Sequence, residues 1–194
     1  MFIGNFAHHV EMAGMLPEAL VCWQVGGYAY PTKSIYDRFI EAGDSVRRKS
    51  SILTESELSV YGGKLRNSVS GNSLPWSCAG FIRLKYGAWK DETSASTTAV
   101  QEVNYGTNLR VIRYADVLLM ASEAFNKSGN DQLAISYLNL VRKRVGLSDL
   151  SVSGSALFDA IVKERQLELA FEGHRFQDLK RWGLAKRYYQ SREN

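Results

Sequence analysis

Hydrophobic positions in the second half of the chain recur at helical spacing and predict two helices joined by a short turn. The segment "RYADVLLMASEAFNKSGNDQLAISYLNLVRKRVGL" runs from Arg113 to Leu147. Within its first helix, Val117 to Ala121 are apolar all round, which predicts deep burial. This helix ends near Gly129. Two helices joined by so short a turn are expected to lie antiparallel.

The second helix begins at Asn130 or Asp131, because both residue types are common N-caps, and it ends at Gly146. Its predicted apolar face consists of Leu133, Ala134, Tyr137, Leu138, Val141 and Val145. The turn at Gly129 and Asn130, followed by the small Ala134, resembles a tetratricopeptide unit. A second unit is not visible at the expected period of about 34 residues, so an array of such units is incomplete here.

Two more helices are predicted toward the C-terminus. The third runs from about Ser155 to Glu172, with Ser155 as a candidate N-cap and Gly173 at its end. The fourth is "RFQDLKRW", and its predicted inner face carries Phe176, Leu179 and Trp182. Helical spacing also predicts that Phe171, Phe176 and Trp182 belong to the core.

The first half is less regular. The segment "PTKSIYDRFIEAGD" predicts a helix that starts after Pro31 and Thr32 and stops at Gly43. Residues 50–80 are polar and contain several glycines, which predicts a loop, and residues 81–89 alternate as a strand does. We therefore expect a mainly α fold of tetratricopeptide-like hairpins with long irregular loops and a short strand or hairpin. Residues 1–194 form one region, with a loop-rich part at 1–108 and a helical scaffold at 109–194.

Composition narrows the possible functions. The chain is 45% hydrophobic and 23% charged, which suits a globular protein, and no apolar run reaches the roughly 18 residues of a membrane span. A net charge of +4 with interspersed acids argues against nucleic acid as a partner.

The N-terminus lacks the pattern of a signal peptide, and Leu20 and Val21 before Cys22 do not fit a lipoprotein cleavage site. The spacing of Cys22, Cys78 and the histidines predicts no metal site, and no motif indicates a cofactor.

A row of carboxylates continues the apolar face of the third helix through Glu164, Glu168 and Glu172. One hypothesis is a carboxylate pair for glycoside hydrolysis, which needs two carboxyl groups facing each other and one raised pKa. These acids instead follow one another along one helix, and nearby arginines would keep them ionised. The candidates for those partners are Arg113, Arg142, Arg165, Arg175 and Arg181. An interhelical ion-pair network is therefore the favoured interpretation.

Large aromatic side chains on the irregular half form the candidate ligand site. They are Trp23, Tyr28, Tyr30, Trp76, Tyr86 and Trp89. Rings on loops either anchor the loops or touch a ligand, and both interpretations stay open for each residue. Sugar rings present flat C–H faces that stack on such side chains.

Three helical segments, "RYADVLLMASEAFNKSG", "AISYLNLVRKRVGL" and "IVKERQLELAFEGHRFQDLKRWG", together resemble the C-terminal part of the SusD/RagB family. Upstream, "GYAYPTKSIYDRFIEAGDSVRRKSSIL" resembles that family's Pro-Thr helix and Asp-x-Arg region, so the resemblance extends from about residue 26 to 183. The family's strongest motif matches Glu164, Arg165, Glu168, Glu172, Arg175, Asp178 and Arg181. With Arg113, these residues are carried over as a structural ion-pair network.

The resemblance implies a surface-exposed lipoprotein of the outer membrane of Bacteroidetes that captures glycans or, in some members, peptides. It implies a SusC-like TonB-dependent transporter as partner, no catalytic activity, and contact with the membrane only through a lipid anchor that this chain lacks. Family members run to several hundred residues, so the chain resembles a C-terminal piece. The alternatives are a tetratricopeptide-like scaffold that binds proteins, a peptide-binding member of the family, and a hydrolase that uses the glutamates.

Overall fold

The chain divides into two compact units, Met1–Arg110 and Val111–Asn194. A computed structural model describes residues 10–12, 20–21, 30–60, 63–65, 78–85, 88–89 and 111–190. Of these, 10–12, 20–21, 63–65, 88–89, 187 and 189–190 are described by their backbone alone. Within these ranges no helix is long and apolar enough to cross a membrane. Nor do these ranges bring together three His, Cys, Asp or Glu side chains that could hold a metal ion.

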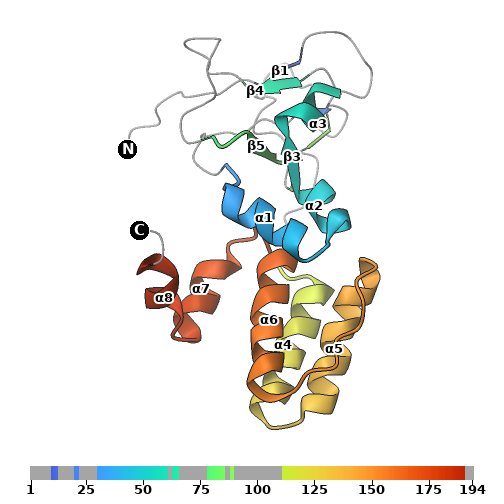
Figure 1. Ribbon diagram of the computed structural model, residues 1–194, viewed down its shortest axis with the longest axis vertical. Helices are drawn as coiled ribbons and strands as arrows, with labels where there is room; N and C mark the ends of the chain where they lie inside the picture. The colour runs from blue at the N-terminus through green and yellow to red at the C-terminus, as the bar shows by residue number, and fades with distance from the viewer. Residues whose placement is uncertain are drawn as a thin grey trace. The chain divides into compact units, whose positions relative to one another are not determined.

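The second unit is helical (Figure 1). Helices α4 (Tyr114–Lys127), α5 (Asp131–Arg144) and α6 (Gly154–Glu168) pack against one another, and α7 (His174–Arg181) and α8 (Ala185–Gln190) follow. Their shared core consists of Leu118, Leu119, Ala134, Leu138, Val141, Leu157 and Ile161. The mainly α fold predicted from the sequence is confirmed.

Helices α4 and α5 form an antiparallel hairpin with a tight turn. Gly129 takes a left-handed backbone conformation with φ of 82°, which a residue with a side chain rarely adopts. Asn130 then caps α5, because its side-chain oxygen accepts a hydrogen bond from the backbone N–H of Leu133 at 3.2 Å. Farther along the hairpin, the Ser122 hydroxyl donates to the carbonyl of Ala134 at 2.7 Å. Ala134 itself is fully buried, so this contact leaves little room for a larger side chain at that position.

Side chains of α5 also fix the segment that leads into α6. Asp131 accepts hydrogen bonds from the Asn126 side chain at 2.8 Å and from the backbone N–H of Gly154 at 2.5 Å. Asn139 exchanges two hydrogen bonds with the backbone of Leu150, both at 3.0 Å. These contacts tie the segment between α5 and α6 to the hairpin.

Several predicted burials are wrong. Val117 and Met120 are 43% and 45% exposed, whereas Leu118 and Leu119 are buried, so the run is not buried all round. Leu133 is likewise 42% exposed. Phe176 is 53% exposed, because α7 points it away from the core. The sequence pattern shows that these positions are apolar but not which faces of the helices have neighbours.

The turn between α6 and α7 also differs from prediction. The helix α6 ends at Glu168 and not at Glu172. Its cap is Ser153 in place of the predicted Ser155, without a side-chain hydrogen bond. Phe171 has a positive φ of 66° and is partly exposed, and Gly173 follows with φ of 81°. Two left-handed residues within three positions reverse the chain, which ends α6 early and lets α7 start at once.

The first unit contains more regular structure than the sequence predicts. Helix α1 (Lys33–Glu41) is capped by Thr32 and followed by Gly43, which has φ of 65°. The predicted loop is wrong over its beginning, since α2 (Ser45–Ser51), β3 (Ile52–Thr54) and α3 (Glu55–Val60) occupy it.

Short antiparallel strand pairs complete this unit. Strand β3 pairs with β5 (Phe81–Arg83), with Leu53 opposite Ile82. The other pairs are β1 (Val10–Met12) with β4 (Gly63–Leu65), and β2 (Leu20–Val21) with β6 (Ala88–Trp89). Leu53, Leu58 and Ile82 form a small core beneath β3 and β5.

Buried arginines stabilise α2. The Asp44 side chain caps the helix by accepting from the backbone N–H of Arg47 at 3.0 Å, and it also accepts from the Arg47 side chain. Arg48 donates to both carboxylate oxygens of Glu57 in α3 at 2.6 Å. Burial by itself would raise the pKa of Glu57, but hydrogen bonds from Arg48 and Thr54 outweigh it and lower that pKa.

Candidate functional site

The six aromatic candidates fall mostly outside the part of the chain that the structure describes. Trp23, Tyr28, Trp76 and Tyr86 lie in ranges it leaves out. Trp89 belongs to strand β6, whose backbone pairs with β2, with Trp89 opposite Leu20. Tyr30 is the one candidate whose side chain is described, just before α1. Its surroundings are therefore the described portion of the candidate ligand site.

Tyr30 belongs to a group of partly exposed side chains near β5. Burial, with a smaller effect of the nearby Cys78, raises the pKa of Tyr30 to about 12. Cys78 is a free thiol and donates to the carbonyl of Phe81 at 3.6 Å. The Phe81 ring stacks on Tyr36 with 4.6 Å between ring centroids. The phenol of Tyr30 stays protonated at neutral pH, so it can both donate and accept a hydrogen bond.

The carboxylates of the predicted stripe each bind an arginine in the second unit. Arg113, just before α4, donates to both oxygens of Glu172, at 2.8 and 2.6 Å, and to Glu168 at 2.9 Å. Arg144 of α5 donates to both oxygens of Glu168 at 2.7 Å. Burial alone would lower the pKa of Arg113, but hydrogen bonds to Glu172 and Glu168 outweigh it and raise that pKa. The end of α6 is thus held to α4 and to α5.

A second pair joins the last turn of α5 to α6. Arg142 donates to the buried Glu164 at 3.0 Å, and its Nε donates to the carbonyl of Ser148 at 3.0 Å. The Arg142 guanidinium therefore connects α5 both to α6 and to the loop that follows α5.

The most buried arginine of the network is Arg165, whose side chain is 4% exposed. It donates to Asp116 of α4 at 2.8 Å and to Asp178 of α7 at 2.9 and 3.2 Å. A single side chain from α6 therefore holds two other helices.

Arg181 continues this network at the end of α7. It donates to both oxygens of Glu123 in α4, at 2.5 and 2.6 Å, and to Asp178 at 3.0 and 2.9 Å. The indole N–H of Trp182 also donates to Glu123, at 2.8 Å. Burial would raise the pKa of Glu123, but hydrogen bonds from Arg181 and Trp182 outweigh it and lower that pKa.

Arg175 contacts a side-chain amide, a backbone carbonyl and an aromatic ring. It donates to the Gln166 side chain at 3.2 Å and to the carbonyl of Val162 at 3.4 Å, and its guanidinium lies 4.7 Å from the ring centroid of Tyr188. These contacts join α6, α7 and α8.

The sequence analysis missed three partners in the network, namely Asp116, Glu123 and Arg144. They lie on α4 and α5, between 24 and 59 residues from the groups they bind. The sequence did contain one indication of these partners, namely acidic residues on the largely apolar α4. A buried acid needs a cationic partner. The arrangement links helices through paired charges, and the carboxylates of the stripe do not face one another across an open cleft as hydrolysis requires.

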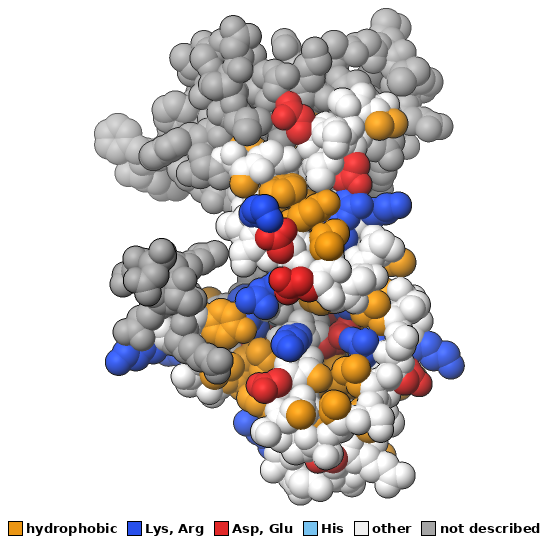
Figure 2. All heavy atoms as spheres, in the orientation of Figure 1, with side chains coloured by type: hydrophobic (Ala, Val, Ile, Leu, Met, Phe, Trp, Pro, Cys, Tyr) orange, Lys and Arg blue, Asp and Glu red, His pale blue; other side chains and the backbone are white. Residues whose placement is uncertain are grey.

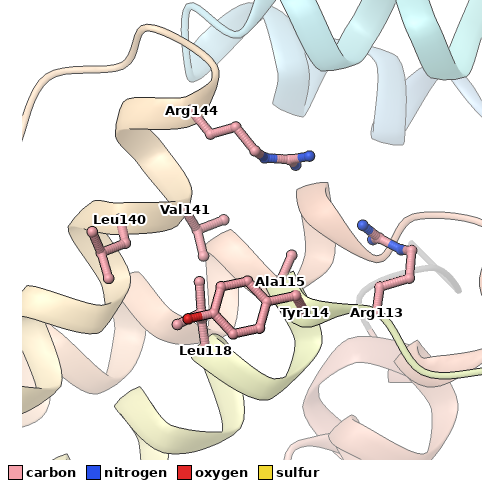
Figure 3. Close-up of a pocket in the computed structure, with 7 residues that line it drawn as sticks. All are labelled: Arg113, Tyr114, Ala115, Leu118, Leu140, Val141 and Arg144. Atoms are coloured by element: carbon pink, nitrogen blue, oxygen red, sulfur yellow. The ribbon is translucent and has the colours of Figure 1, made fainter.

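A pocket of about 190 Å³ opens at one end of the α4–α5 hairpin (Figure 3). Tyr114, Ala115 and Leu118 line it from α4, and Leu140 and Val141 line it from α5. Arg113 and Arg144 lie at its edge, where Figure 3 shows their guanidinium groups on the side away from Leu118. The pocket is therefore mainly apolar with a cationic edge.

On the face drawn in Figure 2, acidic, basic and apolar side chains are interspersed over the described surface of each unit. This distribution agrees with the mixed charge of the sequence, in which 24 basic and 20 acidic residues occur.

Comparison with known proteins identifies related chains. Two proteins of Formosa agariphila, SusD-like protein P2 and SusD-like protein P38, are 40% identical over 93 residues and 34% identical over 132 residues. These matches cover 43% and 55% of this chain, and 18% and 26% of the respective relatives.

Solved structures agree with these sequence matches. A laminarin-binding SusD-like protein is 33% identical, with a TM-score of 0.67 over 84% of this chain and 32% of that one. Surface glycan-binding protein A from Bacteroides thetaiotaomicron, in complex with laminarihexaose, is 28% identical, with a TM-score of 0.61 over 87% of this chain and 36% of that one.

The chain thus spans about a third of the length of these solved relatives and less of the curated ones. The sequence profile of the SusD family matches residues 27–194, which include α1 and the whole ion-pair network. The chain belongs to the SusD family.

Proposed function

We propose that this chain is part of a cell-surface protein of the outer membrane that binds oligosaccharides without chemically altering them. The observation that supports this most is the similarity to two structures named for binding laminarin and laminarihexaose. In this proposal the bound sugar passes to a SusC-like TonB-dependent transporter, and a lipid anchor outside this chain holds the protein to the membrane.

The aromatic side chains of the first unit would supply the binding surface. Trp23, Tyr28, Tyr30, Trp76, Tyr86 and Trp89 are the proposed ligand residues. Stacking of sugar C–H faces on these rings would give affinity, and the protonated phenol of Tyr30 would hydrogen-bond a sugar hydroxyl. An open site with few charged contacts gives modest affinity, since ordering the sugar and the loops carries an entropic cost.

The helical unit would support this site without touching the ligand. The network of Arg113, Glu164, Arg165, Glu168, Glu172, Arg175, Asp178 and Arg181 joins α4 to α8 through buried or half-buried contacts. We propose that its role is structural, because the carboxylates in it accept hydrogen bonds from guanidinium groups and a general acid would need a raised pKa.

The test is an oligosaccharide array that includes laminarihexaose, probed with the wild-type chain and with Trp76→Ala, Trp89→Ala and Tyr30→Phe variants. Circular dichroism should first show that each variant keeps its helices. We expect one glycan class to bind and at least one aromatic truncation to abolish that binding, with a smaller loss for Tyr30→Phe. Binding of peptides in place of glycans, or turnover of a polysaccharide that Glu168→Gln removes, would contradict the proposal.

A further inference from the structure

Helices α7 and α8 are attached to the helical unit in a different way from α4, α5 and α6. Those three helices share an apolar core, whereas α7 buries one apolar side chain, Leu179, and one acid, Asp178. Trp182 adds an edge-to-face contact with Phe158 of α6, with 5.8 Å between ring centroids. The described side chains of α8 are at most partly buried. Burial of apolar surface, the main force that packs helices together, therefore contributes little to this attachment.

Charged contacts supply most of the attachment. Arg165 of α6 binds Asp178 of α7, and Arg181 of α7 binds Glu123 of α4. Arg175 adds hydrogen bonds from α7 to α6. If a helix held in this way moves off, its charged groups regain water, which offsets much of the attraction that is lost. Separating α7 from α4 and α6 should therefore cost less than deleting one partner while the other stays buried.

Helices α7 and α8 are joined to each other by contacts of their own. The backbone N–H of Leu184 donates to the carbonyl of Leu179 at 2.8 Å. The guanidinium of Arg175 lies 4.7 Å from the ring centroid of Tyr188. These contacts do not involve α4, α5 or α6, so they can persist when the two helices move together. We call residues 174–190 the strap.

The turn that leads into the strap is strained. Phe171 has a φ of 66°, which residues with side chains seldom adopt, and Gly173 follows with a φ of 81°. A residue held in this region persists only where its surroundings enforce it. Rotation of the chain at this turn lets Phe171 return to an ordinary conformation. Opening of the strap thus releases strain and keeps the hydrogen bonds within α7 and α8.

Acid acts on one of the contacts that hold the strap. Glu123 accepts hydrogen bonds from Arg181 and Trp182, and Arg165 of α6 is a further cation that acts on it. Burial alone would raise the pKa of Glu123, but the bonds from the strap outweigh it and lower that pKa below the ordinary 4.5. Once the strap has left, Glu123 recovers an ordinary pKa and binds a proton more readily. Protons therefore favour the open strap.

We propose that the strap is an acid-sensitive device, in which α7 and α8 swing together away from α4 and α6 while these helices and α5 stay folded. Arg165 keeps Asp116 as a partner when Asp178 leaves, because both remain on the folded helices. The closed form is favoured at neutral pH, and opening increases as the pH falls below about 4.5. This inference concerns the helical unit and does not rest on glycan binding.

The test is amide hydrogen exchange of the whole chain, followed by NMR at several urea concentrations and pH values. We expect the protected amides of the strap to share one free energy of opening and one urea slope, both smaller than those of Leu119 and Leu138. Their protection should be at least about tenfold lower than in this core. Between pH 7 and pH 3.5 it should fall a further threefold or so, while core protection holds.

Matched variants on α7 separate the charge from other effects. Arg181→Met removes the charge and keeps an apolar stem beside Trp182, whereas Lys180→Met makes the same kind of change at the neighbouring exposed position. We expect Arg181→Met to lower strap protection at pH 7 at least about fivefold and to flatten its pH dependence, with core protection kept. Lys180→Met should change neither.

Four results would overturn the proposal. The strap and the core could lose protection together, which would make α7 and α8 part of one cooperative unit. The amides of α7 and α8 could follow separate urea slopes, or show none, as in fraying of single turns. Strap protection could stay constant down to pH 3.5. Finally, Arg181→Met could match Lys180→Met, or could unfold α4 to α6 in circular dichroism.

Discussion

Arg165 and Asp178 form a paired contact inside the second unit, with Nε to Oδ2 at 2.9 Å and Nη2 to Oδ1 at 3.2 Å. Their side chains are 4% and 6% exposed. The remaining Nη1 of Arg165 reaches Asp116, so three helices meet at one guanidinium. A charge this well enclosed is tolerated only when its partners are present.

Arg165→Ala should therefore destabilise the chain strongly. The change leaves Asp116 without this partner and weakens the hold on Asp178, and loss of one partner from a buried ion pair costs about 3–5 kcal/mol. Urea denaturation followed by circular dichroism measures the free energy of unfolding. Lys163→Ala, an exposed position on the same helix, is the control and should change that free energy little. A loss below about 1 kcal/mol for Arg165→Ala would show that the contact behaves like a surface pair.

Acid should weaken the contact between α4 and α7 through Glu123. Its pKa is lowered below the ordinary 4.5 in the folded chain, so its contribution is fully present above the unfolded pKa and is lost as pH falls through the folded one. Glu123→Gln removes this contribution. We expect the stability difference between wild type and Glu123→Gln to be largest near neutral pH and to shrink between about pH 5 and pH 3.

Urea midpoints measured across that pH range check the prediction. Asp149→Asn, which changes an exposed acid in the loop after α5, is the control and should change the urea midpoint little. A Glu123→Gln difference that stays constant down to pH 3 would contradict a lowered pKa.

Tyr30 should ionise later than an ordinary tyrosine. Its raised pKa of about 12 means that its contribution to stability is present below the unfolded value of 10.0 and is lost as pH rises toward 12. Because the chain has 10 tyrosines, the absorbance titration of Tyr30→Phe is subtracted from that of wild type. We expect the difference to show one phenol that ionises near pH 12 while circular dichroism remains folded. A step near pH 10 would mean that the phenol is freely solvated.

Close packing of α4 on α5 should make Ala134 intolerant of larger residues. Ala134 is fully buried, and its carbonyl accepts from the Ser122 hydroxyl at 2.7 Å. Ala134→Leu forces the helices apart, and overpacking of this kind costs about 1–3 kcal/mol. Thermal and urea unfolding measure the loss. Ala156→Leu, the same change at an exposed position, should be close to neutral, and equal losses in the two variants would argue against a packing cause.

The hairpin of α4 and α5 could be predicted from the sequence because its determinants are local. Gly129 and Asn130 specify the turn, and Leu138 and Val141 lie on the face that the periodicity indicates. What the periodicity could not reveal is which apolar residues are covered. Val117 and Leu119 look alike in sequence, yet Val117 is 43% exposed and Leu119 is fully buried. The burial of each depends on which other elements pack against its face of the helix.

The structure of residues 45–60 could not be predicted for a different reason. Arg47 and Arg48 look like a solvated basic run, but ion pairs with Asp44 and Glu57 bury them and hold α2 and α3 in place. The ion-pair partners Asp116 and Glu123 were missed because they are distant in sequence. The aromatic candidates apart from Tyr30 have no described side chains, so their role stays a prediction.

Asn139 offers Leu150 one donor and one acceptor, as the backbone of a neighbouring strand would. Both hydrogen bonds can form only while the side chain of Asn139 is an amide. Deamidation, the slow hydrolysis that converts asparagine to aspartate as a protein ages, would replace the donating nitrogen with an oxygen. Two acceptors, a carboxylate oxygen and the Leu150 carbonyl, would then face each other. The durability of this one tie between α5 and the segment before α6 therefore depends on the chemical lifetime of an amide, whereas the carboxylates and guanidinium groups of the adjoining network do not age by this route.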